Sequence, residues 1–200
     1  MHNCKKILFL RHGDTCFSGK YIGSFDVPLS AKGLQQIKKI RSFILLQKIE
    51  KVFCSPMLRC LQTFEQLALS LSAPVNLEEN LREINFGRWE GKSFKEIVET
   101  DPDLVDQWSK GYANFTFPEG ENIAHFIQRV EQIKSQILSI NHHRILVISH
   151  GGVIRSMICS LLGQSQEKYL QYAVEKGTVS MIEVYENGAV LKGFNLKPMG

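Results

Sequence analysis

Short apolar runs that each end in polar residues alternate along this chain with amphipathic helical stretches. Each run has the length and composition of a strand buried on both faces of a sheet. The three runs span residues 6–10, 51–55 and 144–149, and they lead into Arg11-His12-Gly13-Asp14, Ser55-Pro56 and Ser149-His150-Gly151-Gly152. Such runs can only pair with one another in the interior of a protein, so they predict a buried sheet whose strands end at polar loops.

Apolar residues recur at helical spacing between these runs. The stripes are Leu34, Ile37, Ile40 and Ile44; Leu58, Leu61, Phe64, Leu67 and Leu71; and Ile123, Phe126, Ile127, Val130, Ile133 and Ile137. A fourth helix is expected from Val153 to Leu162, ending at Gly163. Near the C-terminus, Glu186-Asn187-Gly188 separates two strand-like runs and predicts a hairpin. This alternation predicts an α/β fold, a three-layer α/β/α sandwich with a mostly parallel central sheet.

The length of 200 residues fits a single domain spanning residues 1–200. Residues from about 80 to 121 differ from the rest, because they show poor periodicity and contain both tryptophans, Trp89 and Trp108. We expect this stretch to be an insertion that forms a small cap over the carboxyl ends of the strands. Trp89 and Trp108 are then expected in the core of the cap, with stacking on a substrate as the alternative.

The composition excludes several classes of protein and partner. With 44% hydrophobic and 22% charged residues the chain is neither disordered nor a coiled coil. The net charge of +4 is mild and dispersed, so no nucleic acid is expected, and no run approaches the roughly 20 apolar residues of a membrane helix. The five cysteines are odd in number and lack a C-x-x-C pair, which predicts free thiols in the cytoplasm. The expected partner is a small phosphorylated metabolite, bound by a monomer or a homodimer without a cofactor or metal.

Ligands of parallel sheets bind outside the carboxyl ends of the strands, so the residues that follow the runs are expected to converge. These residues are Arg11, His12, Ser55 and His150, with Arg59 one helical turn beyond Ser55. Arginine binds phosphate through bidentate hydrogen bonds and keeps its charge. A neutral imidazole can attack phosphorus, a second one can stabilise the transferring oxygens, and a glutamate can protonate the leaving oxygen. The pattern indicates phosphoryl transfer without a metal.

Four ordered blocks resemble the histidine phosphatase (phosphoglycerate mutase-like) superfamily. Arg11-His12-Gly13-Asp14-Thr15 is similar to its R-H-G-[EDQ]-[ST] signature, and Val147-Ile148-Ser149-His150-Gly151-Gly152 to its second-histidine motif. Between them, Ser55-Pro56-Met57-Leu58-Arg59 is similar to its S-x-x-x-R segment, and residues 81–91 to its L-x-E-x-x-F-G-x-[WF]-[ED]-G block. The resemblance implies a phosphoglycerate mutase-like fold and a phosphoric monoester hydrolase that works through a phosphohistidine.

The resemblance also implies a role for individual residues. His12 is implied to be the nucleophile, and Glu83 the proton donor to the leaving group and then the base that activates water. A phosphate pocket is implied for Arg11, Arg59 and His150, with backbone amides at Gly13 and Gly151 close to the phosphate. Ser18 and Gly23 are further candidates for substrate binding. Many relatives have asparagine at the position of Ser18 and threonine at that of Ile22, so the polar rim of the pocket departs from the family pattern.

Within the superfamily, the chain is most similar to the α-ribazole-5′-phosphate phosphatases of cobalamin assembly in its compact length and in the residues of the Glu83 and His150 blocks. The alternatives are a broad-specificity sugar-phosphate phosphatase, a fructose-2,6-bisphosphatase-like enzyme and a phosphoglycerate mutase. A mutase is disfavoured because only about 60 residues separate Glu83 from the strand near Arg144. A phosphate-binding protein without turnover has no need of Glu83.

Other residue patterns point to less probable chemistry. A cysteine phosphatase needs C-x5-R, whereas Cys54 and Arg59 are one residue too close. His142-His143 lacks further ligands at metal-binding spacing and is expected in a solvated turn. Glu121, at the start of a helix, is expected to complement the helix dipole, with a substrate contact as the alternative.

Overall fold

The computed structural model describes residues 4–68, 71–110 and 114–197. Within these residues a mixed sheet of six strands runs in the order β3-β2-β4-β1-β5-β6. The strands are β1 (Lys5–Arg11), β2 (Lys51–Cys54), β3 (Val75–Leu77), β4 (Arg144–Ser149), β5 (Val179–Tyr185) and β6 (Gly188–Leu196). β1, β2, β3 and β4 are parallel, whereas β5 is antiparallel to both β1 and β6. The chain therefore has the predicted α/β fold with a mostly parallel sheet, and β5–β6 is the predicted hairpin.

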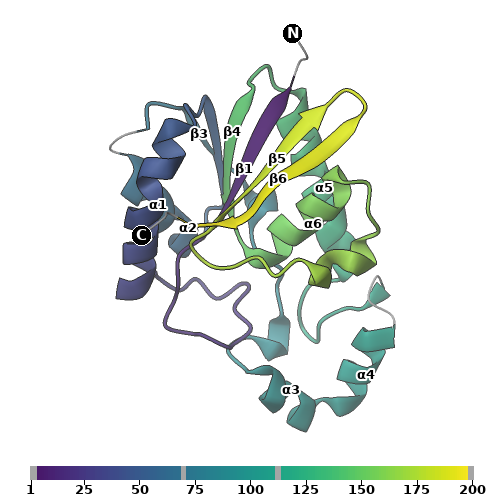
Figure 1. Cartoon of the computed structure of the whole chain (residues 1–200). Helices are drawn as coiled ribbons and strands as arrows, with labels where there is room; N and C mark the ends of the chain where they lie inside the picture. Colours follow the sequence, from purple (N-terminus) through teal and green to yellow (C-terminus); the bar gives the residue numbers. More distant parts are fainter. Residues whose placement is uncertain (1–3, 69–70, 111–113, 198–200) are drawn as a thin grey trace.

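Helices cover both faces of this sheet (Figure 1). The helices of the sandwich are α1 (Ala31–Leu46), α2 (Leu58–Ala68), α5 (Ile123–Ser139) and α6 (Gly151–Leu161). Alternate side chains of β1 enter two separate cores. Leu8 and Leu10 pack with α1 and α2, and Ile7 and Phe9 pack with α5 and α6. This period-2 division is what a strand buried on both faces requires.

Two of the three predicted helical stripes are the buried faces of α1 and α5. In α2 the prediction was only partly right, because the buried residues are Arg59, Cys60, Thr63 and Leu67, and Leu61 and Phe64 are partly buried. Ile37 and Ile40 of α1 are fully buried, and so are Val130 and Ile133 of α5. The hydroxyl of Ser30 accepts a hydrogen bond from the Gly33 amide and so caps α1. α6 begins two residues before the predicted Val153, and its C-terminal end is followed by Gly163, whose φ is +65°.

The segment from about 80 to 121 lies beyond the carboxyl ends of the strands, where Figure 1 shows α3 and α4. Its elements are η1 (Glu79–Leu81), η2 (Gly87–Trp89), α3 (Phe94–Thr100) and α4 (Pro102–Lys110), and residues 111–113 of the expected cap lie outside the described residues. The helices are short, which explains the poor periodicity. Trp89 is fully buried among them, and its Nε1 donates to Oδ2 of Asp101 at 2.8 Å. The apolar side chains of this cap continue the core on the α5–α6 face of the sheet.

The remaining element, η4 (Gln166–Gln171), follows α6 and packs against it. Its residues Tyr169 and Leu170 line the same surface cavities as Trp108 of the cap. Among the helices of the described residues, none is long and apolar enough to cross a membrane.

Candidate active site

His12 lies directly after β1, where the strand leaves the centre of the sheet. Its side chain is 5% exposed, and its Nδ1 is 2.7 Å from the carbonyl oxygen of Gly13. Because a carbonyl oxygen only accepts, Nδ1 carries the proton, and the neutral ring presents its lone pair at Nε2. The backbone amide of His12 donates to the Ser149 carbonyl at 3.0 Å, which holds the residue against β4. This geometry suits Nε2 for nucleophilic attack.

The surroundings keep the His12 imidazole uncharged. Burial lowers its pKa well below the usual value, and the nearby Arg11 and Arg59 guanidinium groups lower it further. The hydrogen bond to Gly13 opposes this shift only in part. His12 is therefore neutral at neutral pH, as a nucleophile must be.

Arg11, the last residue of β1, lines the cavity next to His12 and has one buried hydrogen-bond donor without a partner in the described part of the chain. Its Nη1 donates to the Val174 carbonyl at 2.6 Å, while its buried Nε has no hydrogen-bond partner among the described residues. Burial is the main cause that lowers its pKa to about 10, and Glu83 opposes the shift. The guanidinium still carries its charge at neutral pH. An unsatisfied buried N–H on a cation is costly unless an anion accepts from it, so this atom suits a phosphate oxygen.

Arg59 lies in the first turn of α2 and is completely buried. Its Nη1 and Nη2 donate to the carbonyls of Phe25 and Gly23, both at 2.8 Å, and its Nε donates to Nδ1 of His150 at 3.2 Å. The guanidinium therefore ties the loop after β1 to the start of α2. A guanidinium has five N–H groups, so two remain for a ligand.

His150 lies one layer behind the cavity wall. Its Nδ1 accepts from Arg59, so its Nε2 carries the proton and donates to the Ser55 hydroxyl at 2.8 Å. Its ring meets the His12 ring edge-on at a centroid distance of 5.2 Å. Both nitrogens are thus used by the protein, and His150 is not among the residues that line the cavity. The structure places it where it orients His12 and Arg59, whereas direct contact with phosphate oxygens stays a prediction from the resemblance.

Glu83 faces the cavity from the start of the cap segment. Its Oε2 accepts from the Gly152 amide in the first turn of α6 at 3.0 Å, and its Oε1 accepts from the Ile84 amide at 3.2 Å. A Cβ at Gly152 would lie 2.5 Å from Oε1, which explains the second glycine of the His-Gly-Gly motif.

Arg129 on α5 holds the backbone that carries Glu83. Its guanidinium donates to the carbonyls of Asn80, Arg82 and Glu83 at 3.0, 2.7 and 3.2 Å. The same group forms a two-point ion pair with Glu121 at 2.7 and 2.9 Å. Glu121 is therefore neither a substrate contact nor only a dipole partner, and sequence reasoning missed Arg129 altogether. Nothing in the helical pattern of α5 indicates carbonyl partners almost 50 residues upstream.

The four other predicted binding residues have different places in the structure. Gly151 lines the cavity at the first position of α6, where the helix supplies no acceptor for its amide. Gly13 does not line the cavity. Its amide donates to the Thr63 hydroxyl at 3.4 Å, and a Cβ there would lie 2.6 Å from the Gly33 carbonyl oxygen. Gly23 supports Arg59 through its carbonyl and also lies outside the lining. Ser18 is exposed outside the cavity, while its neighbours Phe17 and Gly19 line it.

The cavity between the sheet and the cap has a volume of about 300 Å³. The lining is mostly basic, because it includes Arg11, Lys20, Arg59, Arg155 of α6 and Lys176, against Glu83 as the single acid among the described residues. It is also aromatic and includes Tyr21, Phe86 and Trp108. Arg155 was not predicted, although its position four residues after Gly151 on the same helix is a signal that could have found it.

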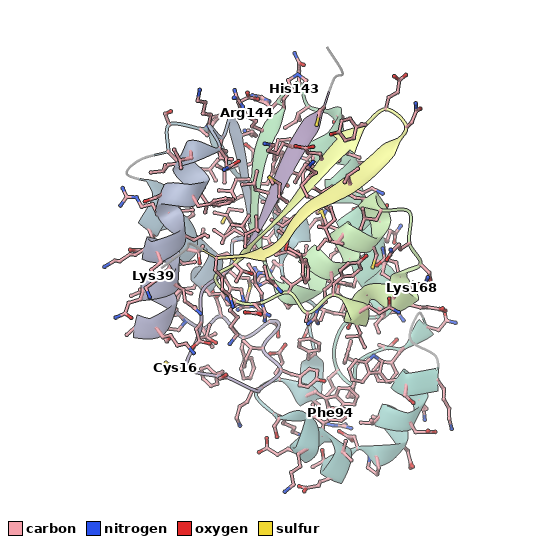
Figure 2. All side chains as sticks on the ribbon, in the orientation of Figure 1. Cys16, Lys39, Phe94, His143, Arg144 and Lys168 are labelled. Atoms are coloured by element: carbon pink, nitrogen blue, oxygen red, sulfur yellow. The ribbon has the colours of Figure 1, made fainter. Side chains whose placement is uncertain are left out.

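The remaining histidine pair lies away from this site. Figure 2 shows His143 and Arg144 at the end of the molecule opposite to Phe94 of the cap. The amide of His143 donates to Glu50, whose carboxylate also pairs with Arg144. Across the described ranges no three His, Cys, Asp or Glu side chains are grouped so that they could hold a metal ion.

Comparisons with known proteins agree with this geometry. The sequence model of the histidine phosphatase superfamily (branch 1) matches residues 7–197. The chain is 27% identical over 198 residues to an adenosylcobalamin/alpha-ribazole phosphatase of Escherichia coli (strain K12), covering 98% of each chain. It is 25% identical over 194 residues to phosphoserine phosphatase 1 of Hydrogenobacter thermophilus, covering 96% of this chain and 92% of the relative. The crystal structure of the alpha-ribazole phosphatase of Shigella flexneri superposes with a TM-score of 0.88 at 26% identity, covering 98% of both chains.

Proposed function

The chain belongs to the histidine phosphatase superfamily (branch 1) and is a phosphatase, and from this premise we propose that it hydrolyses α-ribazole 5′-phosphate through a phosphohistidine at His12. One observation carries the mechanism. His12, with its proton on Nδ1, lines one cavity together with Glu83 and Arg11, whose buried Nε has no partner among the described residues.

In the first step, Nε2 of His12 attacks phosphorus and forms a P–N bond while the ester P–O bond breaks. The leaving oxygen takes a proton from the Glu83 carboxyl group and departs as the alcohol. The guanidinium groups of Arg11 and Arg59 stabilise the charge on the phosphoryl oxygens. In the second step, water gives a proton to the Glu83 carboxylate and attacks phosphorus. The P–N bond breaks, its electron pair returns to Nε2, and inorganic phosphate leaves.

The substrate is proposed from the relatives' names and from the size of the cap. Alpha-ribazole phosphatases cover almost the whole of this chain at 26–27% identity. A second candidate is phosphoserine, because a relative named phosphoserine phosphatase 1 is 25% identical over 194 residues. We place the protein in the cytoplasm as a monomer or homodimer. The free state of all five cysteines is consistent with that location.

Steady-state hydrolysis by the purified protein in EDTA tests the proposal. The panel contains α-ribazole 5′-phosphate, phosphoserine, 3-phosphoglycerate, fructose 2,6-bisphosphate and p-nitrophenyl phosphate. We expect kcat/KM for α-ribazole 5′-phosphate to exceed the others at least about tenfold, and His12→Ala to retain less than about 1% of the activity. Equal values across the panel would reject the substrate. Higher activity of His12→Ala would reject the nucleophile, and inhibition by EDTA would reject the metal-free mechanism.

A further inference from the structure

A second cavity of about 690 Å³ opens beside the phosphate site. The two cavities share four lining residues, which are Tyr21, Trp108, Tyr169 and Leu170. None of the groups assigned to phosphate chemistry lines the second cavity. A ligand bound at His12 and larger than its phosphate group can therefore continue past these four side chains. The first cavity alone is at the lower end of the volumes that hold small organic ligands, about 300–1,000 Å³.

The shared wall is aromatic, and its rings are held in place. Trp108 of α4 packs against Trp89, Phe117 and Tyr21 at centroid distances of 5.7, 5.7 and 6.3 Å. Tyr169 also lines both cavities, and the guanidinium of Arg155 lies 5.9 Å from the centre of its ring. A planar ring entering between them would meet rigid apolar surfaces suited to offset or edge-on contacts.

Leu170 at the rim is 61% exposed, although large aliphatic side chains gain free energy from burial. It lines both cavities, next to the Tyr169 ring. Among the described residues, the charged side chains that line the second cavity are Lys110 and Glu167, and Lys110 already pairs with Asp106 at 2.7 Å. A flat heterocycle lying against the shared wall would cover the exposed leucine.

We propose that the second cavity binds the alcohol part of the phosphate ester and selects one that carries a flat aromatic heterocycle. The heterocycle lies between Trp108 and Tyr169 and covers Leu170. This inference rests on the proposed phosphatase function and assigns the residues that select its substrate. α-Ribazole 5′-phosphate belongs to the proposed class, because a benzimidazole is attached to its ribose. Phosphoserine and ribose 5-phosphate do not.

The first test compares α-ribazole 5′-phosphate with ribose 5-phosphate, which has the phosphate and the sugar but no heterocycle. The measured quantity is the ratio of their kcat/KM values. We expect this ratio to exceed ten in the wild type and to fall about tenfold in Leu170→Asp, because a charged group would replace the apolar contact. Leu77→Asp is the matched control, since Leu77 is 56% exposed on the edge strand β3, and it should leave the ratio unchanged. A ratio near one in the wild type, or equal ratios in all three proteins, would overturn the proposal.

The second test measures binding without chemistry. Free α-ribazole is titrated into the His12→Ala protein while tryptophan fluorescence is recorded. Trp89 is fully buried and Trp108 lines both cavities, so the expected quenching should disappear in a Trp108→Phe background. Quenching without hydrolysis of any ester by the wild type would reject the phosphatase and keep the aromatic site. Hydrolysis of both esters with equal kcat/KM and without quenching would reject the aromatic site and keep the phosphatase.

Discussion

At the scale of single residues, the site keeps a neutral nucleophile among permanent cations. Arg11 and Arg59 favour the phosphate dianion, and the same charges keep the His12 ring unprotonated. Of the residues that the structure describes, Glu83 is the only acid that lines the cavity, and its carboxyl group is held by two backbone amides. The chemistry of the leaving oxygen therefore depends on this one side chain.

Glu83→Gln should slow hydrolysis of an alkyl ester such as α-ribazole 5′-phosphate by roughly 10²–10⁴-fold in kcat. The amide cannot protonate the leaving oxygen, and its single oxygen can accept from only one of the two backbone amides, Gly152 or Ile84. p-Nitrophenyl phosphate should lose much less, because its leaving oxygen needs no proton. Glu79→Gln, an exposed glutamate four residues earlier, is the control and should change neither rate. An equal loss on both esters would contradict the acid role of Glu83.

His12, Arg11 and Arg59 could be predicted from the sequence because each lies at, or within a few residues of, the end of a buried strand. Ser18 was suggested by the family resemblance instead, and in the structure its neighbours Phe17 and Gly19 line the cavity whereas Ser18 does not. Contacts that join distant segments, such as those of Arg129, carry no local signal.

Ser18→Ala therefore tests whether Ser18 contacts the substrate, as the family pattern suggests, or lies away from it, as in the structure. We expect less than a twofold change in kcat/KM, because the Ser18 side chain is exposed outside the cavity. Steady-state kinetics with α-ribazole 5′-phosphate and p-nitrophenyl phosphate provide the measurement. A loss of tenfold or more would restore the substrate contact that the resemblance suggests.

At the scale of elements, α5 supports the acid of the site through Arg129, which does not itself line the cavity. The guanidinium joins three backbone carbonyls of residues 80–83 to one carboxylate, and it also lies 4.8 Å from the centre of the Phe126 ring. Removing it would leave those carbonyls and Glu121 without their cation, which is costly for partly buried groups.

Arg129→Met is expected to lower kcat for alkyl esters at least about tenfold, with a smaller change in KM, since misplacement of Glu83 affects proton transfer more than binding. The diagnostic readout is the loss of rate on alkyl esters compared with the loss on p-nitrophenyl phosphate. As in Glu83→Gln, the loss should be larger on alkyl esters. Arg129→Lys should recover part of the rate, because an ammonium can hold some of the carbonyls. Arg82→Met, which removes a surface arginine paired only with Glu79, is the control. If Arg129→Met lost equal activity on alkyl and p-nitrophenyl esters, its role would be limited to stability.

The loop after β1 and the cap segment meet at close backbone contacts. A Cβ on Gly23 would lie 1.8 Å from the Ile84 carbonyl oxygen, and Glu90 accepts hydrogen bonds from the amides of both Gly23 and Phe86. This contact explains why the Gly23 block and the Glu83 block occur together in one sequence.

Gly23→Ala should therefore lower both stability and activity. The added methyl group forces the two loops apart and moves the Gly23 carbonyl away from Arg59. We expect a fall in Tm of several degrees and a loss of kcat/KM of at least about tenfold. Thermal unfolding and steady-state rates check both effects. Wild-type values for both would show that the loops do not pack as described.

At the scale of the whole molecule, the long buried elements were predictable and the short ones were not. β1, β2 and β4 are continuous apolar runs and the helices α1 and α5 show a helical period, all within 4–17 residues of local sequence. β3 has three residues, and α3 and α4 have seven and nine, so their patterns are too short to read. These short elements depend on tertiary contacts, of which the burial of Trp89 is the clearest.

The fold also holds two histidines at its centre in their neutral form. His12 and His150 are almost completely buried, and burial followed by the nearby arginines lowers the pKa of each well below the usual value. In the unfolded chain both titrate near pH 6.5. As the pH falls through that value, the unfolded chain binds protons that the folded chain does not, so stability must fall.

The contribution of His12 can be isolated by comparing the wild type with His12→Gln, whose amide does not titrate. Above about pH 7.5 the difference in free energy of unfolding should be constant. Below pH 6.5 the wild type should lose stability relative to the variant by up to about 1.4 kcal/mol per pH unit, until the pKa of folded His12 is reached. Urea unfolding between pH 5 and 8 in a buffer free of phosphate measures this, since phosphate would bind the native site and mask it. Parallel curves would mean that folded His12 titrates like an exposed histidine, and the neutral nucleophile would lose its structural basis.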